Sequence, residues 1–199
     1  MNSKNRDFIC LMDFNKEELE KLLELAIDIK NGKNLERCLE NKFIGLLFSV
    51  ASTRTRISFQ LGVKQMGGHA EFFDYNDLQL INHESLVDTA KVMSRYLDAL
   101  IIRMYDMSFY GKGREALNLM AQHADIPIIN ALDDKGHPCQ VMGDILTLKE
   151  KFGEDYKKKK NCFHLGLCGQ AEVARGSSID VDRFIYLRNE CNFCLPEGL

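Results

Sequence analysis

Hydroxyl and guanidinium side chains crowd one short segment, directly after an apolar run. In chain order they are Ser52, Thr53, Arg54, Thr55 and Arg56. Hydroxyl groups donate hydrogen bonds, and the planar fork of Arg54 suits phosphate oxygens. At a helix start, unpaired N–H groups and the dipole would also favour an anion, while Arg56 would point elsewhere and brace the loop. An ordinary Ser/Thr helix cap with solvated arginines explains the same residues, so both interpretations stay open.

Two more polar positions follow apolar runs. Arg103 ends the run at 99–103, and His137 and Gln140 follow the run at 126–131, where a proline opens a helix. A helix start disfavours the imidazolium, so a neutral His137 can donate to a carbonyl oxygen. The amide of Gln140 both donates and accepts. The alternatives are that Arg103 only marks the strand's exit into solvent, that His137 is a cap and that Gln140 is solvated.

The elements that would position these residues alternate between helix and strand. Apolar runs predict strands at 43–50, 70–73, 99–103 and 126–131. Helical spacing predicts helices at 16–30, 55–66, 86–96, 113–124 and 138–152, with a capping box at 15–18 and a loop at 74–84. We therefore expect an α/β fold, a parallel sheet flanked by helices. Because the carboxyl ends of parallel strands meet at one edge, where ligands bind, the three motifs should converge there.

The composition changes after residue 152. Residues 153–160 are polar and end in four lysines, which indicates a solvated linker. Apolar runs at 162–167 and 190–195 flank a glycine-bearing turn and a helical stretch from 171 to about 184, which predicts the start of a second α/β domain. One such unit cannot bury both faces of its sheet, so we expect the chain to end inside that domain. The predicted domains are 1–152 and 153–199.

The bulk composition narrows the class of protein. The net charge is −3, so a general attraction to nucleic acid is not expected. With no leader and no apolar run near the ~18 residues that span a bilayer, we expect a cytoplasmic protein and no membrane contact. Seven scattered cysteines do not form a disulfide framework and read as buried thiols. A zinc site is the weaker alternative, and its four ligands would be Cys162, Cys168, Cys191 and Cys194.

Taken together, the motifs resemble one enzyme family. Ser-x-Arg-Thr-Arg at 52–56, His-Pro-x-Gln at 137–140 and the block at 84–103 are similar to the aspartate/ornithine carbamoyltransferase family. The resemblance covers about residues 13–153. It implies transfer of the carbamoyl group from carbamoyl phosphate to an amine, without metal, redox cofactor or covalent enzyme intermediate. It also implies a homotrimer with sites shared between subunits.

The resemblance assigns roles to the site residues. Those that would hold the phosphate are Ser52, Thr53, Arg54 and Thr55; those that would hold the carbamoyl end are Arg103, His137 and Gln140. When the amine attacks the carbonyl carbon, negative charge grows on the carbonyl oxygen. Arg103, His137 and Thr55 are donors suited to that oxygen, as in an oxyanion hole, and are the expected catalytic residues. Arg54 and the helix start would stabilise the leaving phosphate.

Ornithine is the expected acceptor. The block at 88–96 and the seven-residue step from Asn130 to His137 look more like the ornithine branch. The aspartate branch usually carries a lysine before Glu84, where this chain has Ile-Asn-His. The residues at 166–175 replace the ornithine branch's Gly-Asp-Gly-Asn-Asn turn, leaving Gln170 and Glu172 as candidates for binding the amine. The alternatives are an aspartate carbamoyltransferase-like enzyme and a module that binds carbamoyl phosphate, or only phosphate, without turnover.

Overall fold

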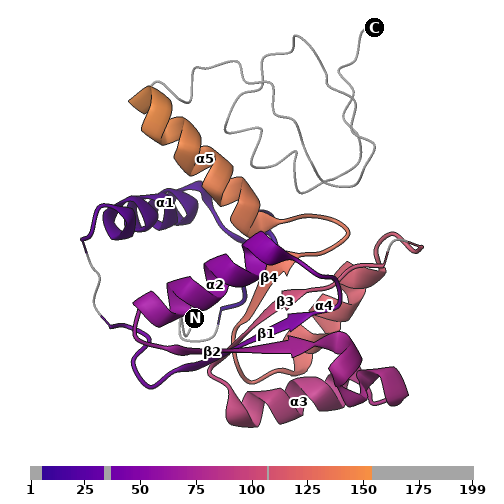
Figure 1. The fold of residues 1–199 in the computed structure, drawn as a ribbon. Coiled ribbons are helices and arrows are strands. Elements are labelled where there is room, and N and C mark those ends of the chain that lie inside the picture. The colour runs from indigo at the N-terminus through magenta and orange to yellow at the C-terminus, as the bar shows by residue number, and fades with distance from the viewer. Residues whose placement is uncertain (1–5, 34–36, 107, 154–199) are drawn as a thin grey trace, which may run out of the picture.

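The computed structural model of the protein describes residues 6–33, 37–106 and 108–153. Within them, four parallel strands form one sheet with helices on both faces (Figure 1). The strands are β1 (Phe43–Phe48), β2 (His69–Asp74), β3 (Ala99–Arg103) and β4 (Ile128–Leu132). The α-helices are α1 (Lys16–Lys30), α2 (Thr53–Gln65), α3 (Leu86–Tyr96), α4 (Lys112–His123) and α5 (Pro138–Phe152). The 3-10 helices are η2 (Leu11–Asp13), η3 (Tyr75–Asp77) and η4 (Gln79–Asn82). The predicted α/β fold is confirmed.

The strand order contains one reversal of direction. The strands lie side by side as β2-β1-β3-β4, and each neighbouring pair is parallel. The chain moves from β1 outward to β2, then crosses back over β1 to β3 and continues to β4. The sheet therefore has a topological switch point between β1 and β3, which is where open α/β sheets bind ligands.

The two faces of the sheet bury different side chains of the same strands. On β1, Leu47 packs into the cluster that includes Met93 of α3 and Leu117 of α4. Its neighbours Leu46 and Phe48 point to the opposite face, which α2 covers. This alternation follows from the two-residue period of a strand. Because both faces are apolar, the strands read as continuous hydrophobic runs.

Helices α1 and α5 pair on the α2 side of the sheet (Figure 1). Leu19 and Leu23 of α1 pack against Ile145 of α5 in a separate apolar cluster. The α1 capping box is present as predicted: the amide of Glu18 donates to the side chain of Asn15, and the Glu18 carboxylate accepts from the Asn15 amide. This pair of helices stabilises the frame on which α5 begins.

Several predicted boundaries shift by one or two residues. The strand expected at 43–50 ends at Phe48, and the helix expected from residue 55 begins at Thr53, because Ser52 serves as its N-cap. The strand expected at 126–131 runs instead from Ile128 to Leu132, since Pro127 has no N–H group for the ladder. β2 is one residue longer at each end, α4 begins and ends one residue earlier, and 74–84 includes η3 and η4 rather than only loop. The second domain predicted at 153–199 lies outside the described residues, apart from residue 153.

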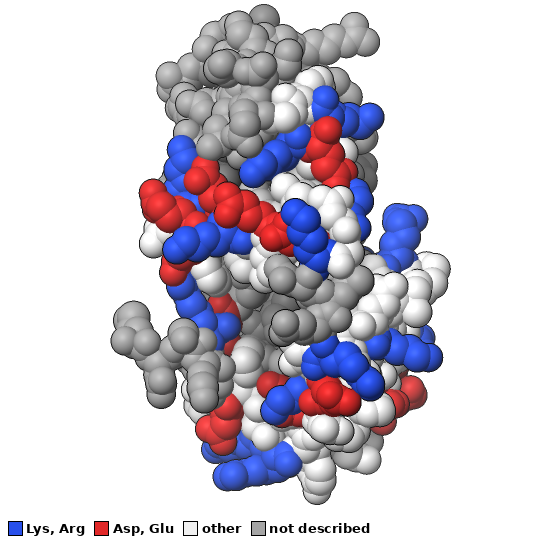
Figure 2. Space-filling view, turned by 90° about the vertical axis from the view of Figure 1, so that its left-hand side faces the viewer, with Lys and Arg blue, Asp and Glu red and all other residues white. Residues whose placement is uncertain are grey.

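The visible surface carries both signs of charge. Figure 2 shows lysines and arginines interspersed with acidic residues over one face of the molecule. This mixing agrees with the small net charge of −3. None of the helices that the structure describes is long and apolar enough to cross a membrane.

Candidate functional site

The three sequence motifs leave the same edge of the sheet from neighbouring strands. Phe48 at the end of β1 is in register with Arg103, and the amide of Ser49 donates to the Arg103 carbonyl at 2.9 Å. On the other side, Arg103 pairs with Leu132, and the amide of Met104 donates to the Leu132 carbonyl at 3.0 Å. Arg103 therefore lies between the turn that enters α2 and the turn that enters α5. This is the carboxyl edge beside the switch point.

The turn from β1 to α2 is an open helix start. Ser52 is the N-cap, and its hydroxyl accepts from the Thr55 amide over a long 3.4 Å. Thr53 and Arg54 are exposed in the first turn, and that turn, described in full, holds no acidic residue. Backbone N–H groups, hydroxyls and one guanidinium are therefore presented together without a carboxylate to compete with an anion.

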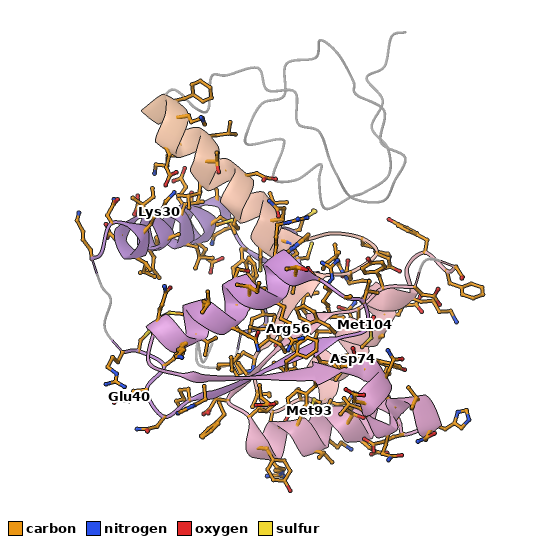
Figure 3. All side chains as sticks on the ribbon, viewed as in Figure 1. Lys30, Glu40, Arg56, Asp74, Met93 and Met104 are labelled. Atoms are coloured by element: carbon orange, nitrogen blue, oxygen red, sulfur yellow. The ribbon has the colours of Figure 1, made fainter. Side chains whose placement is uncertain are left out.

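Arg56 is also exposed, but its guanidinium contacts the sheet. Its guanidinium lies 3.7 Å from the centre of the Phe72 ring on β2. Figure 3 shows Arg56 between α2 and the strands. The cation–π contact holds the helix against the sheet. This placement agrees with the expectation that Arg56 braces the loop.

Arg103 carries an unsatisfied donor. Its Nε atom is buried and has no hydrogen-bond partner among the described residues, and the same holds for the Ser49 hydroxyl beside it. The guanidinium carbon lies 5.6 Å from the centre of the Tyr105 ring. A buried donor left unpaired costs about 1–3 kcal/mol. The fold accepts this cost at the edge where the sequence predicts the carbamoyl group.

His137 is the N-cap of α5, and Pro138 opens the helix as predicted. The Gln140 amide donates to the Nδ1 atom of His137 at 3.3 Å. With Nδ1 as acceptor, this hydrogen-bond pattern assigns the proton of a neutral ring to Nε2. The cap and the proposed donor role are therefore compatible, because they use different nitrogens. The Gln140 side chain is exposed, and its amide donates to Asp144 at 2.9 Å.

Cys139 lies within the same motif but is not suited to nucleophilic chemistry. Its thiol sits 3.5 Å from the Asn130 carbonyl. Burial raises the pKa of the Cys139 thiol to about 12. The thiol is therefore protonated at neutral pH, and a thiol is far less nucleophilic than a thiolate.

A buried carboxylate organises the turn from β4 to α5. Asp133 has no exposed side-chain surface and accepts from the guanidinium of Arg114 through both Nε and Nη2. It also accepts from the Asn130 side chain at 3.0 Å and from the amides of Lys135 and Gly136 at 2.7 Å each. Sequence reasoning missed this network. Two aspartates shortly before a glycine are a turn signal that would have drawn attention to the loop, but nothing local indicates the arginine.

Metal binding finds no support in the described part of the chain. Those residues contain no group of three or more His, Cys, Asp or Glu side chains placed to hold a metal ion. The four cysteines considered for zinc lie outside them, as do the candidates Gln170 and Glu172.

Comparison with known proteins adds independent findings. The family model described as the aspartate/ornithine carbamoyltransferase carbamoyl-P binding domain matches residues 6–150. The ornithine carbamoyltransferase of Symbiobacterium thermophilum is 47% identical over 154 residues, which cover 75% of this chain and 47% of that protein.

Solved structures give the same result. The ornithine carbamoyltransferase of Pyrococcus furiosus matches with a TM-score of 0.66 and 40% identity, over 75% of this chain and 46% of that chain. The enzyme from Thermus thermophilus matches with a TM-score of 0.67 and 33% identity, over 74% and 49%. The chain spans about half the length of the curated relatives it matches.

Proposed function

This chain belongs to the aspartate/ornithine carbamoyltransferase family, and from that premise we propose that it binds carbamoyl phosphate and serves carbamoyl transfer to ornithine. The observation that carries the proposal is the meeting of three motifs at one edge of the sheet. Three adjacent strands beside the switch point carry these motifs: the open turn follows β1, Arg103 ends β3, and His137 comes after β4. Such an edge suits a small ligand with an anionic end and a carbonyl end.

The phosphate end belongs at the start of α2. Ser52, Thr53 and Thr55 supply hydroxyl groups, the first helical turn supplies N–H groups, and the exposed Arg54 supplies a fork of donors. The partial positive charge at the helix start also favours the phosphate as it departs.

The carbamoyl end belongs beside Arg103 and His137. In the transfer, the amine nitrogen forms a bond to the carbonyl carbon, the bond from that carbon to the phosphate oxygen breaks, and phosphate leaves with the electron pair. The amine loses one proton. Charge on the carbonyl oxygen peaks between these events, and donors from Arg103, from Nε2 of His137 and from Thr55 would stabilise it. Gln140 would hold the carbamoyl amide.

The same proposal includes a division into domains and an oligomeric state. Residues 1–152 would form the carbamoyl-phosphate-binding domain, and 153–199 would form a linker and part of the domain for the amino-acid acceptor.

Assembly as a homotrimer is supported by exposed apolar side chains on α2, where Ile57 and Leu61 are 50% and 53% exposed one turn apart. Sedimentation equilibrium at several concentrations tests the trimer.

Titration calorimetry with inorganic phosphate tests the anion site. We expect Arg54→Ala to lose roughly tenfold or more in affinity, in line with loss of a charge-assisted contact of about 1.5–3 kcal/mol. Arg56→Ala is the matched control, since this arginine lies two residues away on the same helix but rests on Phe72. An Arg54→Ala variant with the affinity of the unsubstituted chain would exclude Arg54 from phosphate binding.

The acceptor is tested separately by following a carbon label from carbamoyl phosphate. We expect the label in citrulline when ornithine and aspartate compete. Label in carbamoyl-aspartate instead would overturn the assignment of ornithine.

A further inference from the structure

We propose that the first turn of α4 positions His137, acting through the contact of Arg114 with Asp133. The inference rests on the proposed function and deepens it. Neither side chain would touch substrate; both would hold the turn that carries the group that does. The predicted roles of Arg103 and His137 require a fixed relative position, and α4 contacts the chain beside each of them.

The start of α4 packs directly against the chain that leaves β3. A methyl group built on Gly113 would lie 2.9 Å from Cα of Tyr105, and closer still to the carbonyl oxygen of Met104. Both residues come directly after Arg103 in the sequence, and Met104 is labelled in Figure 3. Only glycine permits this approach, so the helix start is held against the exit of the strand.

The same helix start also holds the turn from β4 to α5. The carboxylate of Asp134 accepts from the amides of Gly113 and Arg114 at 3.0 Å each. One residue earlier, the buried carboxylate of Asp133 receives the Arg114 guanidinium. Backbone and side chain of one helical turn thus grip two consecutive acidic residues.

Asp133 passes this constraint on to the residues before His137. Its carboxylate accepts from the amides of Lys135 and Gly136 at 2.7 Å, and its own amide donates to the Gly136 carbonyl at 3.0 Å. The turn is therefore closed on itself one residue before α5 begins. An imidazole that follows such a turn has few ways to move.

Stability alone gives little reason for a buried charged pair. The side chains of Arg114 and Asp133 are 13% and 0% exposed. Burial on its own would lower the pKa of Arg114, but the hydrogen bonds and charge of Asp133, with a smaller contribution from Cys10, more than offset it, and the pKa is raised. Replacing both members of a buried pair by neutral groups is often neutral or stabilising. A paired replacement can therefore separate positioning from folding.

The test uses the 199-residue chain with Arg114→Met and Asp133→Asn combined. Because both charges are removed together, no charged side chain is left without a partner. Nitrogen-15 NMR of the histidine rings reports the tautomer and the pH titration of His137, whose signals are assigned by their loss in a His137→Gln variant. We expect a single Nε2–H tautomer in the unsubstituted chain and a mixture in the double variant. The control is Lys42→Met with Asp98→Asn, an ion pair of 2.7 Å at the opposite edge of the sheet, where Asp98 also accepts from a backbone amide.

A second measurement compares two ligands by calorimetry. Inorganic phosphate would contact only the turn at Ser52. Phosphonoacetamide is a stable relative of carbamoyl phosphate, with a methylene group in place of the bridging oxygen, and it would also contact His137. We expect the double variant to keep its phosphate affinity and to lose about tenfold or more for phosphonoacetamide, as displaced catalytic groups do. Arg114→Lys keeps a cation for Asp133 without the fork, so it should fold and move in the same direction if the double variant does not fold.

The outcomes separate the two proposals. An unchanged His137 tautomer together with an unchanged ligand preference would overturn the positioning role, and so would an equal loss for both ligands. If the unsubstituted chain binds neither ligand, the proposed function fails, and the ring tautomer in the ligand-free chain still decides whether Arg114 and Asp133 orient His137.

Discussion

The turns that enter α2 and α5 start at the same edge of the sheet but are built in opposite ways. The turn at Ser52 has one long cap bond of 3.4 Å and exposes Thr53 and Arg54. The turn at Asp133 is closed around a carboxylate with no exposed side-chain surface, which the largely buried guanidinium of Arg114 holds in place.

The difference matches what each turn is proposed to hold. A phosphate is recognised by many donors arranged around it, so the turn at Ser52 must leave its donors open. A carbonyl oxygen that gains charge during a reaction needs each of its donors in a set direction, fixed before the reaction begins. In our proposal, the turn at Asp133 fixes the direction of His137, and its backbone donors are used within the turn rather than left open to a ligand.

Asp133→Ala should have the largest effect, because it leaves the largely buried Arg114 without its carboxylate partner. We expect the free energy of unfolding to fall by about 3–5 kcal/mol, measured by urea denaturation. The comparison of the two turns would break if this loss were no larger than that of Ser52→Ala.

Gly113→Ala should come next, since the added methyl group meets the backbone of Met104 and Tyr105. Overpacking of this kind costs about 1–3 kcal/mol. Gly143→Ala is the matched control: Gly143 also lies in a helix, but a methyl group there meets nothing within 4 Å. We expect that control to raise the free energy of unfolding by roughly 0.5–1 kcal/mol, and a loss of stability in both variants would remove the packing argument.

Ser52→Ala should have the smallest effect on folding. N-cap replacements cost about 0.5–2 kcal/mol, and the 3.4 Å bond places Ser52 near the lower limit. Ser85→Ala on α3 is the sharper cap for comparison, with a bond of 3.0 Å to the Asp88 amide. If Ser52→Ala proved the costlier of the two in thermal denaturation, the turn at α2 would be more rigid than described.

Much of the fold could be predicted because its signals are local. α1, α3, α5 and β3 begin and end where the sequence predicts, since caps, prolines and apolar periodicity lie within the elements themselves. The predicted start of α2 is two residues late, because hydroxyl residues run from 52 to 55 with one interruption and only the backbone shows that Ser52 is the cap.

The site could be predicted only in part. The residue types at 52–56 predicted phosphate binding, and those at 103 and 137–140 predicted contacts with the carbamoyl group. The parallel sheet predicted that all of them lie at one shared edge. The Arg114–Asp133 contact was missed because the two residues lie nineteen positions apart on different elements. No periodicity or motif connects a helix start to a strand end at that separation.

The sequence by itself determined the alternation of strands and helices, the polar groups at three strand ends and the resemblance to a family. Only the tertiary structure decided that β1, β3 and β4 are neighbours, so that those groups leave the same edge of the sheet, and that α4 holds the turn before His137. The reason is physical. Local propensity depends on residues a few positions apart, whereas strand order and buried polar pairs depend on which distant surfaces exclude water together.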